Sequence, residues 1–252
     1  SPWSTAAYAG VGAGIALTGL HLWAAGSLGL APAWLWLQLS ALALVLAWPA
    51  LRVMRQLPAH PMGRAPVAPG GPAAATLPPG TRGMVWSYGI FGFGYILPAT
   101  FLPVLARSLV PDPRLFGLAW PVFGLMAAAS ALAAARWLGR ASRLRVWALA
   151  HAAMGVGTLL PALWLSGWTV GLSALLVGGT FMVATLAGMQ EMRARAGAGA
   201  PRALALMTTA FALGQIAGPV ASTLLLRVPG LGDAGALDAA LAAGAGVLLL
   251  SA

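Results

Sequence analysis

Long apolar stretches alternate with shorter polar segments along the whole chain. An apolar helix of about 20 residues crosses the hydrocarbon core of a bilayer, because each backbone polar group must be hydrogen-bonded within its own segment. The stretches are too continuous for the alternating pattern of a membrane β-barrel. The pattern therefore predicts an all-α, polytopic membrane helical bundle with spans at 5–25, 32–51, 83–105, 115–136, 145–166, 170–190, 203–226 and 235–252.

Composition agrees with a lipid environment. The 252 residues are 60% hydrophobic and 7% charged, whereas soluble domains place about a quarter of their residues in charged types. The net charge of +10 does not indicate nucleic-acid binding, because no arginine cluster is interleaved with aromatic residues on a soluble module. The absence of cysteine excludes disulfides and thiolate metal sites, and we expect neither a metal nor a cofactor.

The distribution of arginine between the spans predicts the orientation. Alternate gaps hold eleven of the fourteen arginines, while the other gaps hold three arginines and three of the four acids. Since cytoplasmic loops carry the excess of basic residues, both chain ends should be cytoplasmic. The use of arginine without lysine, with abundant alanine and glycine, is typical of a GC-rich bacterial genome. We therefore expect a multi-pass protein of the bacterial inner membrane.

The polar segments also suggest a division of the chain. Residues 1–51 form two predicted helices, 52–82 form a proline-rich cytoplasmic linker, and 83–252 form six spans. Many secondary transporters join two six-span halves by a long cytoplasmic loop, so this order matches the last eight of twelve spans. Residue 1 is not methionine and the C-terminus lies in an apolar run, so we expect a fragment or a truncated product.

Several glycine- and aromatic-rich motifs lie within the spans. They are GVGAGI from Gly10, YGIFGFGYILPATF from Tyr88, WPVFG from Trp120, GGTFM from Gly178, GMQE from Gly188 and FALGQIAGP from Phe211. With these motifs the chain resembles the major facilitator superfamily, and within it the YbfB/YjiJ family of bacterial transporters.

That resemblance implies the C-terminal six-span half of a facilitator preceded by two spans. It also implies secondary active transport of a small organic solute by alternating access, with proton-coupled efflux as one form of it. The expected partners are the lipid bilayer, a small-molecule substrate and protons. The chain departs from the superfamily at 138–145, where glycine and arginines occur without an acid, so the gating charge pair lacks its acid there; the charged residues near this end are Arg140, Arg143 and Glu191.

Polar and proline positions within the spans are candidates for a substrate cavity. Pro98 and Pro103 each remove a helical hydrogen bond, which predicts a broken, cavity-lining helix over 88–103. Gln215 lies on one face with Thr208 and Ser222, and it either binds substrate or bonds a neighbouring helix. The full set of cavity candidates is Tyr88, Gly92, Tyr95, Pro98, Thr185, Thr208, Gln215 and Gln38.

Small residues four apart are candidates for close helix packing or for a face that seals between halves. They are Gly10 and Gly14, and Gly214 and Gly218 with Pro219. His21 and His151 are near span ends, where solvation is favoured over a proton-relay role. No central carboxylate is available for proton coupling in the predicted spans.

Two other classes of function were weighed against transport. A membrane enzyme is excluded, because no His/Asp/Glu cluster, HExxH or GxSxG motif occurs. A truncated, non-transporting membrane protein or scaffold is the alternative to a transporter.

Overall fold

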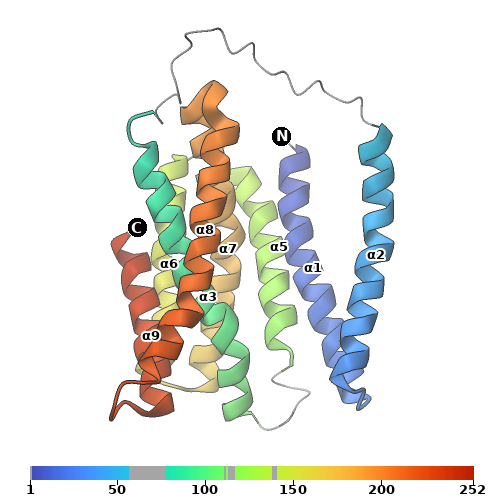
Figure 1. Cartoon of the computed structure of the whole chain (residues 1–252), viewed down its shortest axis with the longest axis vertical. Coiled ribbons are helices and arrows are strands. Elements are labelled where there is room, and N and C mark those ends of the chain that lie inside the picture. The colour runs from blue at the N-terminus through green and yellow to red at the C-terminus, as the bar shows by residue number, and fades with distance from the viewer. Residues whose placement is uncertain (1, 57–77, 111, 113–116, 138–140) are drawn as a thin grey trace. The chain divides into compact units, whose positions relative to one another are not determined.

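The structure is a computed structural model that describes residues 2–56, 78–110, 112, 117–137 and 141–252. In these ranges long helices follow one another and no strand occurs (Figure 1). Each predicted span coincides with one helix, so the all-α prediction is confirmed. The elements are α1 (Pro2–Ser27), α2 (Pro32–Gln56), α3 (Thr81–Leu109), α5 (Ala119–Trp137), α6 (Arg143–Leu163), α7 (Gly167–Ala196), the 3₁₀ turn η1 (Gly197–Gly199), α8 (Ala200–Leu225) and α9 (Gly232–Leu250).

The helices have the length and composition of membrane spans. Six segments of the described chain are long and apolar enough to cross a bilayer, and one of them, Gly167–Leu225, contains both α7 and α8. α5 adds a shorter apolar stretch, Ala119–Ala134. Since hydrophobic length is what a bilayer requires, the polytopic bundle predicted from sequence is confirmed.

Internal contacts divide the chain into two units, Ser1–Trp23 with Leu77–Ala252 and Ala24–Thr76. The second unit contains the end of α1, a turn and α2. Gly29 has a φ of 71° in this turn, a left-handed conformation that favours glycine, and Pro32 then begins α2. α2 has no buried residue, and the Arg52 guanidinium lies 4.7 Å from the centre of the Trp48 ring. Most of the predicted linker falls at 57–77, outside the described residues.

Six helices of the first unit form two sets of three, α3, α5 and α6 in the first and α7, α8 and α9 in the second. Helices of one set pack against helices of the other: α3 packs against α8, and α5 packs against α7. α3 and α7 also contact each other, as do α6 and α9. Because α3 and α7 run in opposite directions (Figure 1), the second set resembles an inverted copy of the first.

Two glycines, one in each set, make equivalent close contacts between the sets. Gly92 of α3 lies directly against the backbone of Phe211 in α8. Gly178 of α7 lies against the backbone of Phe123 in α5. A side chain at either glycine would overlap the neighbouring main chain, so both helix pairs depend on a residue without a Cβ. These contacts bring together α3, α5, α7 and α8, and each of these helices contributes aromatic residues to one core cluster.

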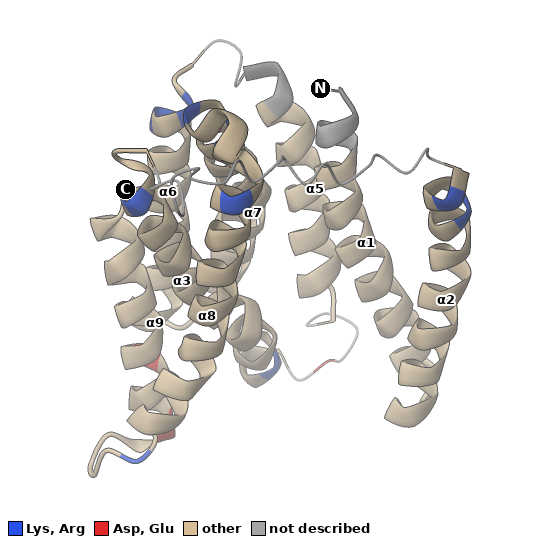
Figure 2. Cartoon of the chain, turned by 45° about the horizontal axis from the view of Figure 1, so that its top comes forward, with Lys and Arg blue, Asp and Glu red and all other residues tan. Residues whose placement is uncertain are grey.

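Charge lies at the ends of this first unit. Figure 2 shows most of its arginines at the end where the C-terminus lies and acidic residues at the opposite end. The first end carries Arg82, Arg143, Arg145, Arg193 and Arg195, and the opposite end carries Arg107, Arg227 and Asp233. The helices between the two ends are apolar, so the observed separation is the one that the sequence pattern predicts.

Candidate functional site

An aromatic cluster lies in the core of the first unit. Tyr88, Phe91 and Tyr95 follow one another at helical spacing on α3, and each is at most 8% exposed. Phe181 of α7 stacks on Tyr95 with ring centres 4.1 Å apart and an angle of 9° between the planes. The Phe211 ring of α8 lies 5.1 Å from that of Phe91. The cluster thus joins three helices through offset and edge contacts that aromatic rings favour.

Polar groups border this cluster toward the arginine-rich end. The Thr185 side chain of α7 lies near the Tyr88 side chain, and its hydroxyl donates to the Phe181 carbonyl at 2.9 Å. Gly188 lies one turn further along α7 and leaves space for the Tyr88 and Trp147 rings, whose atoms would lie 3.2 to 3.4 Å from a Cβ at that position. Tyr88, Tyr95 and Thr185 are therefore brought together, as candidates for one site.

The predicted break in α3 does not occur. The helix runs without interruption from Thr81 to Leu109 and contains both Pro98 and Pro103. Each proline removes one hydrogen bond, and the packed neighbours hold the remaining ones in place, so the broken-helix prediction is wrong. Pro98 is buried, and it lines a small void together with Trp120 and Phe123 of α5.

His151 is buried, whereas the sequence favoured solvation, so that expectation is wrong. Its side chain is 1% exposed and its ring stacks on Phe91 with centres 5.4 Å apart. Nδ1 lies 2.9 Å from the Ser251 hydroxyl of α9's C-terminal end, and that hydroxyl donates to the Leu248 carbonyl. A hydroxyl that donates to Leu248 can accept from Nδ1, so this arrangement suits a ring that carries a proton on Nδ1. Within the described residues Nε2 has no hydrogen-bond partner.

The polar stripe of α8, formed by Thr208, Gln215 and Ser222, differs in burial along its length. Ser222 is buried and donates to the Gly218 carbonyl at 3.0 Å, while Thr208 is exposed and donates to the Leu204 carbonyl at 3.0 Å. Gln215 between them is half-buried. Gln38 lies on an exposed position of α2 in the other unit. The stripe extends along the helix beyond the aromatic cluster, to which α8 contributes the Phe211 ring.

The small-residue motifs pack unequally. Gly214 lies against the Gly89 carbonyl of α3, and Gly218 lies against the Ile96 side chain, while Pro219 follows at an exposed position. A Cβ at Gly10 or Gly14 would meet no atom of another helix within 4 Å, so neither glycine makes a close helix contact there. The close approach of α1 is made instead at Gly12, which lies against the Ala128 backbone of α5.

Glu191 links two helices at the arginine-rich end. Its carboxylate accepts hydrogen bonds from Arg143 at the start of α6, at 2.9 Å, and from Arg195 on its own helix, at 2.7 Å. Arg143, which belongs to the 138–145 segment, is therefore paired with an acid of α7. Arg140 lies outside the described residues. Elsewhere in the described chain, no three His, Asp or Glu side chains are grouped so as to hold a metal ion.

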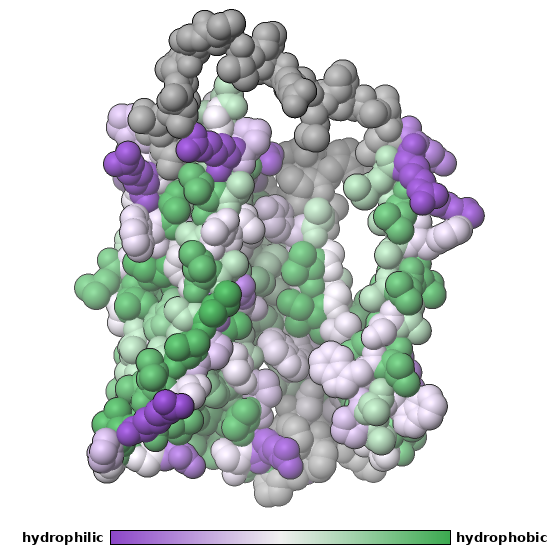
Figure 3. Space-filling view, viewed as in Figure 1, coloured by the Kyte–Doolittle hydropathy of each residue, from purple (hydrophilic) through white to green (hydrophobic). Residues whose placement is uncertain are grey.

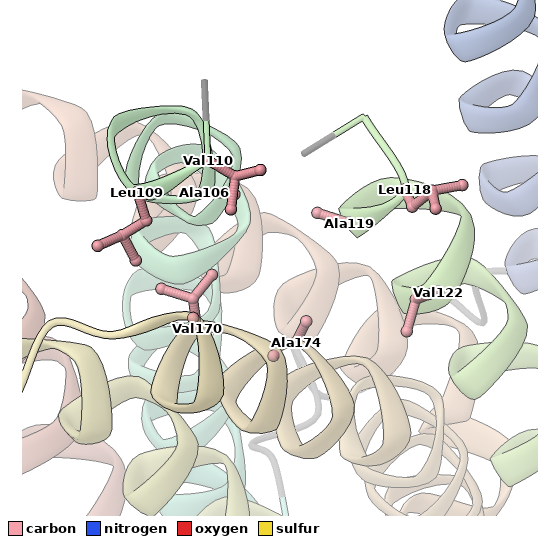
Figure 4. A pocket seen from close by; sticks show the side chains of 10 residues that line it. Ala106, Leu109, Val110, Leu118, Ala119, Val122, Val170 and Ala174 are labelled. Carbon is pink, nitrogen blue, oxygen red and sulfur yellow. The ribbon is translucent and has the colours of Figure 1, made fainter. Parts of the chain in front are cut away.

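A pocket lies at the opposite end of the same unit, between α3, α5 and α7 (Figure 4). Its volume is about 200 Å³, and its labelled lining residues are all aliphatic, with Leu109 and Val110 at the end of α3 and Val170 and Ala174 on α7. The absence of polar groups among these side chains means that the pocket offers shape without directional recognition. It lies apart from the aromatic cluster.

Phe91, Phe123 and Phe211 were missed as site candidates from the sequence, and His151 was considered as a proton relay but expected to be solvated. The spacing of Tyr88, Phe91 and Tyr95, three and then four residues, marks one helix face and was sufficient to identify Phe91. No comparable pattern in the sequence indicates that His151 is buried against α9. Its partner Ser251 lies one hundred positions away, so only the packing of α6 on α9 brings them together.

Comparison with known proteins agrees with this helical architecture. A family model described as "Uncharacterised MFS-type transporter YbfB" matches residues 3–252, nearly the whole chain. No curated protein matches the chain. No solved structure matches it either.

Proposed function

We propose that this chain, which belongs to the YbfB family of MFS-type transporters, moves a small organic solute across the bacterial inner membrane by alternating access. The observation that supports this proposal most directly is the stack of Tyr95 on Phe181. These two residues lie three positions after Gly92 and Gly178, on the two helices that occupy equivalent places in the inverted sets. A contact between the two sets can change when one set rotates against the other.

The side chains of the aromatic cluster indicate the kind of solute. Aromatic rings make up most of the cluster, and Tyr88 and Thr185 add hydroxyl groups to it. No arginine or acidic side chain is buried in the described part of the bundle, where His151 is the buried histidine. A solute with an apolar or aromatic body and a few hydrogen-bonding groups would bind best to side chains of these types.

Transport assays with the purified protein in liposomes test the proposal. A panel of aromatic and amphipathic solutes is offered with and without an imposed pH gradient. We expect accumulation of at least one solute, and a fall of about fivefold for Tyr95→Ala, because a lost aromatic pair is worth about 1 kcal/mol. Trp168→Ala removes a ring that is 90% exposed and serves as the control. Equal flux through empty liposomes would exclude transport of the solutes in the panel.

Coupling to protons is the finer part of the proposal. His151 is a buried histidine of the described helices, and its contact with Ser251 connects it to the arginine-rich end. We expect His151→Gln to abolish the dependence of flux on the pH gradient while solute exchange between the two sides continues. If the variant still responds to the gradient, the coupling group lies elsewhere.

A further inference from the structure

A polar pocket lies at the arginine-rich end of the first unit, between the starts of α3 and α6 and the ends of α7 and α9. Its volume is about 480 Å³. The hydroxyl and guanidinium groups of its lining come from Ser87, Arg145, Arg195 and Ser251. Figure 3 shows hydrophilic residues at this end of the unit and hydrophobic residues along its middle. A space of this size with polar walls is suited to holding water.

The buried ring of His151 lies directly behind the wall of this pocket. Ser251 lines the pocket, and its Oγ lies 2.9 Å from Nδ1 of His151. Trp147 also lines the pocket, and its ring meets that of His151 edge-on with centres 5.4 Å apart. Nε2 has no hydrogen-bond partner within the described residues. The Ser251 hydroxyl is therefore the polar link between the ring and the pocket.

The charged groups around this link are mainly basic. Arg145 of α6 and Arg195 of α7 line the pocket, and Glu191 is paired with Arg195. α3 presents Phe91 to the His151 ring, a side chain that does not titrate. The acids of α9 lie near its other end, at Asp233 and Asp238. A proton released into the pocket is repelled by the guanidinium groups, which favours its escape to water.

We propose that His151 exchanges protons with the arginine-rich end through the Ser251 hydroxyl and the water of this pocket. A ring protonated on both nitrogens gives its Nδ1 proton to Ser251 Oγ, and Ser251 gives its own hydroxyl proton to a water of the pocket. The ring is then neutral with its remaining proton on Nε2, and the reverse steps return a proton to Nδ1. A hydroxyl serves here because it both accepts and donates. This inference rests on His151 as the coupling group of the proposed function, and it adds the side from which that group exchanges protons.

Hydrogen exchange at the ring tests the route without any solute. The full chain is reconstituted in lipid nanodiscs with isotope-labelled histidine. The chain has three histidines, so His21→Gln with His60→Gln leaves His151 as the labelled ring. Loss of the Nδ1 proton signal in heavy water gives the exchange rate. We expect Ser251→Ala to slow this exchange by about tenfold, because the ring must then wait for local opening of the helices.

Two variants control for changes that do not concern the relay. Ser251→Thr keeps a hydroxyl at the same position and should exchange like the native protein. Ser142→Ala removes a hydroxyl of the same end that does not line the pocket, and it should leave the rate unchanged. Equal or faster exchange in Ser251→Ala overturns the relay, as does an equal fall in Ser251→Thr.

Blocking the pocket tests its part in the route. Ser87 lines the pocket and the chain has no cysteine of its own, so Ser87→Cys can be labelled selectively with a bulky maleimide. Labelling should slow exchange at His151 by about tenfold, because water is displaced from the pocket. Labelled Val228→Cys, at the opposite end of the unit, should show no change. Unchanged exchange after complete labelling of Ser87→Cys overturns the pocket as the route.

Transport driven by a pH gradient separates this inference from the proposed coupling. If flux in His151→Gln still responds to the gradient, coupling by His151 fails, while slower exchange in Ser251→Ala still supports the route. If His151→Gln removes the response but Ser251→Ala exchanges protons and transports like the native protein, the coupling stands and the route through Ser251 is overturned.

Discussion

At the scale of single residues, Phe91 has the most central position in the aromatic cluster. Its side chain is fully buried, and its ring contacts those of Tyr88, His151 and Phe211. We expect Phe91→Ala to lower the free energy of unfolding by about 3 kcal/mol, because a cavity replaces these contacts. Reversible unfolding in bicelles measures the loss. Trp168→Ala removes a ring that is 90% exposed and should change stability by a few tenths of a kcal/mol at most.

The ion pair between α6 and α7 supports a second prediction. The Glu191 side chain is 13% exposed and that of Arg143 is 40% exposed, so solvent screens the interaction only in part. A double-mutant cycle of Glu191→Gln with Arg143→Gln should give a coupling of about 1 kcal/mol in the free energy of unfolding. The same cycle with Arg145→Gln should give no coupling, because no ion pair joins Arg145 to Glu191. Similar values in the two cycles would contradict a specific pair.

These residues also show what the sequence can reveal at this scale. The pairing of Glu191 with Arg195 is predictable, since four positions on a helix place them together. The pairing with Arg143 joins positions 48 apart and depends on how α6 packs on α7. The burial of His151 was predicted wrongly for a related reason. Lipid and protein interior are both apolar, so hydrophobicity alone does not show which face of a membrane helix points inward.

At the scale of elements, the sequence predicted where helices lie better than how they pack. Spans were predictable because hydrophobic length must match the bilayer, and α7 extends past its predicted end at 190 to Ala196 through charged residues. The continuity of α3 across two prolines was not predictable, because neighbouring helices decide whether a proline breaks a helix. The contacts of Gly92 and Gly178 became visible only when both helix pairs were in place.

The contact of α3 with α8 supports a prediction for one glycine. A Cβ at Gly92 would overlap the Phe211 carbonyl, and main chain cannot move aside as a flexible side chain can. We expect Gly92→Ala to lower the free energy of unfolding by about 2 kcal/mol, because the helices must separate. Gly171→Ala on α7 meets no atom within 4 Å and should stabilise the protein by up to about 1 kcal/mol through helix propensity. Thermal unfolding of both variants in the same detergent measures these changes in stability. A change of the same sign in both variants would contradict the close contact at Gly92.

At the scale of the whole molecule, the separation of charge predicts which way the chain enters the membrane. Within the first unit the arginine-rich end contains Ser142 before α6, and the opposite end contains Val228 between α8 and α9. Since basic loops remain on the cytoplasmic side, Ser142 should face the cytoplasm and Val228 the exterior.

Single-cysteine labelling tests this orientation without interference, because the chain has no cysteine of its own. Ser142 is exposed and Val228 is 46% exposed, so a thiol at either position can be reached by a reagent on its own side of the membrane. A maleimide that does not cross membranes should label Val228→Cys in intact spheroplasts and Ser142→Cys only after lysis. Labelling of both variants before lysis would indicate mixed insertion, and the reverse order would show that the arginines do not set the orientation.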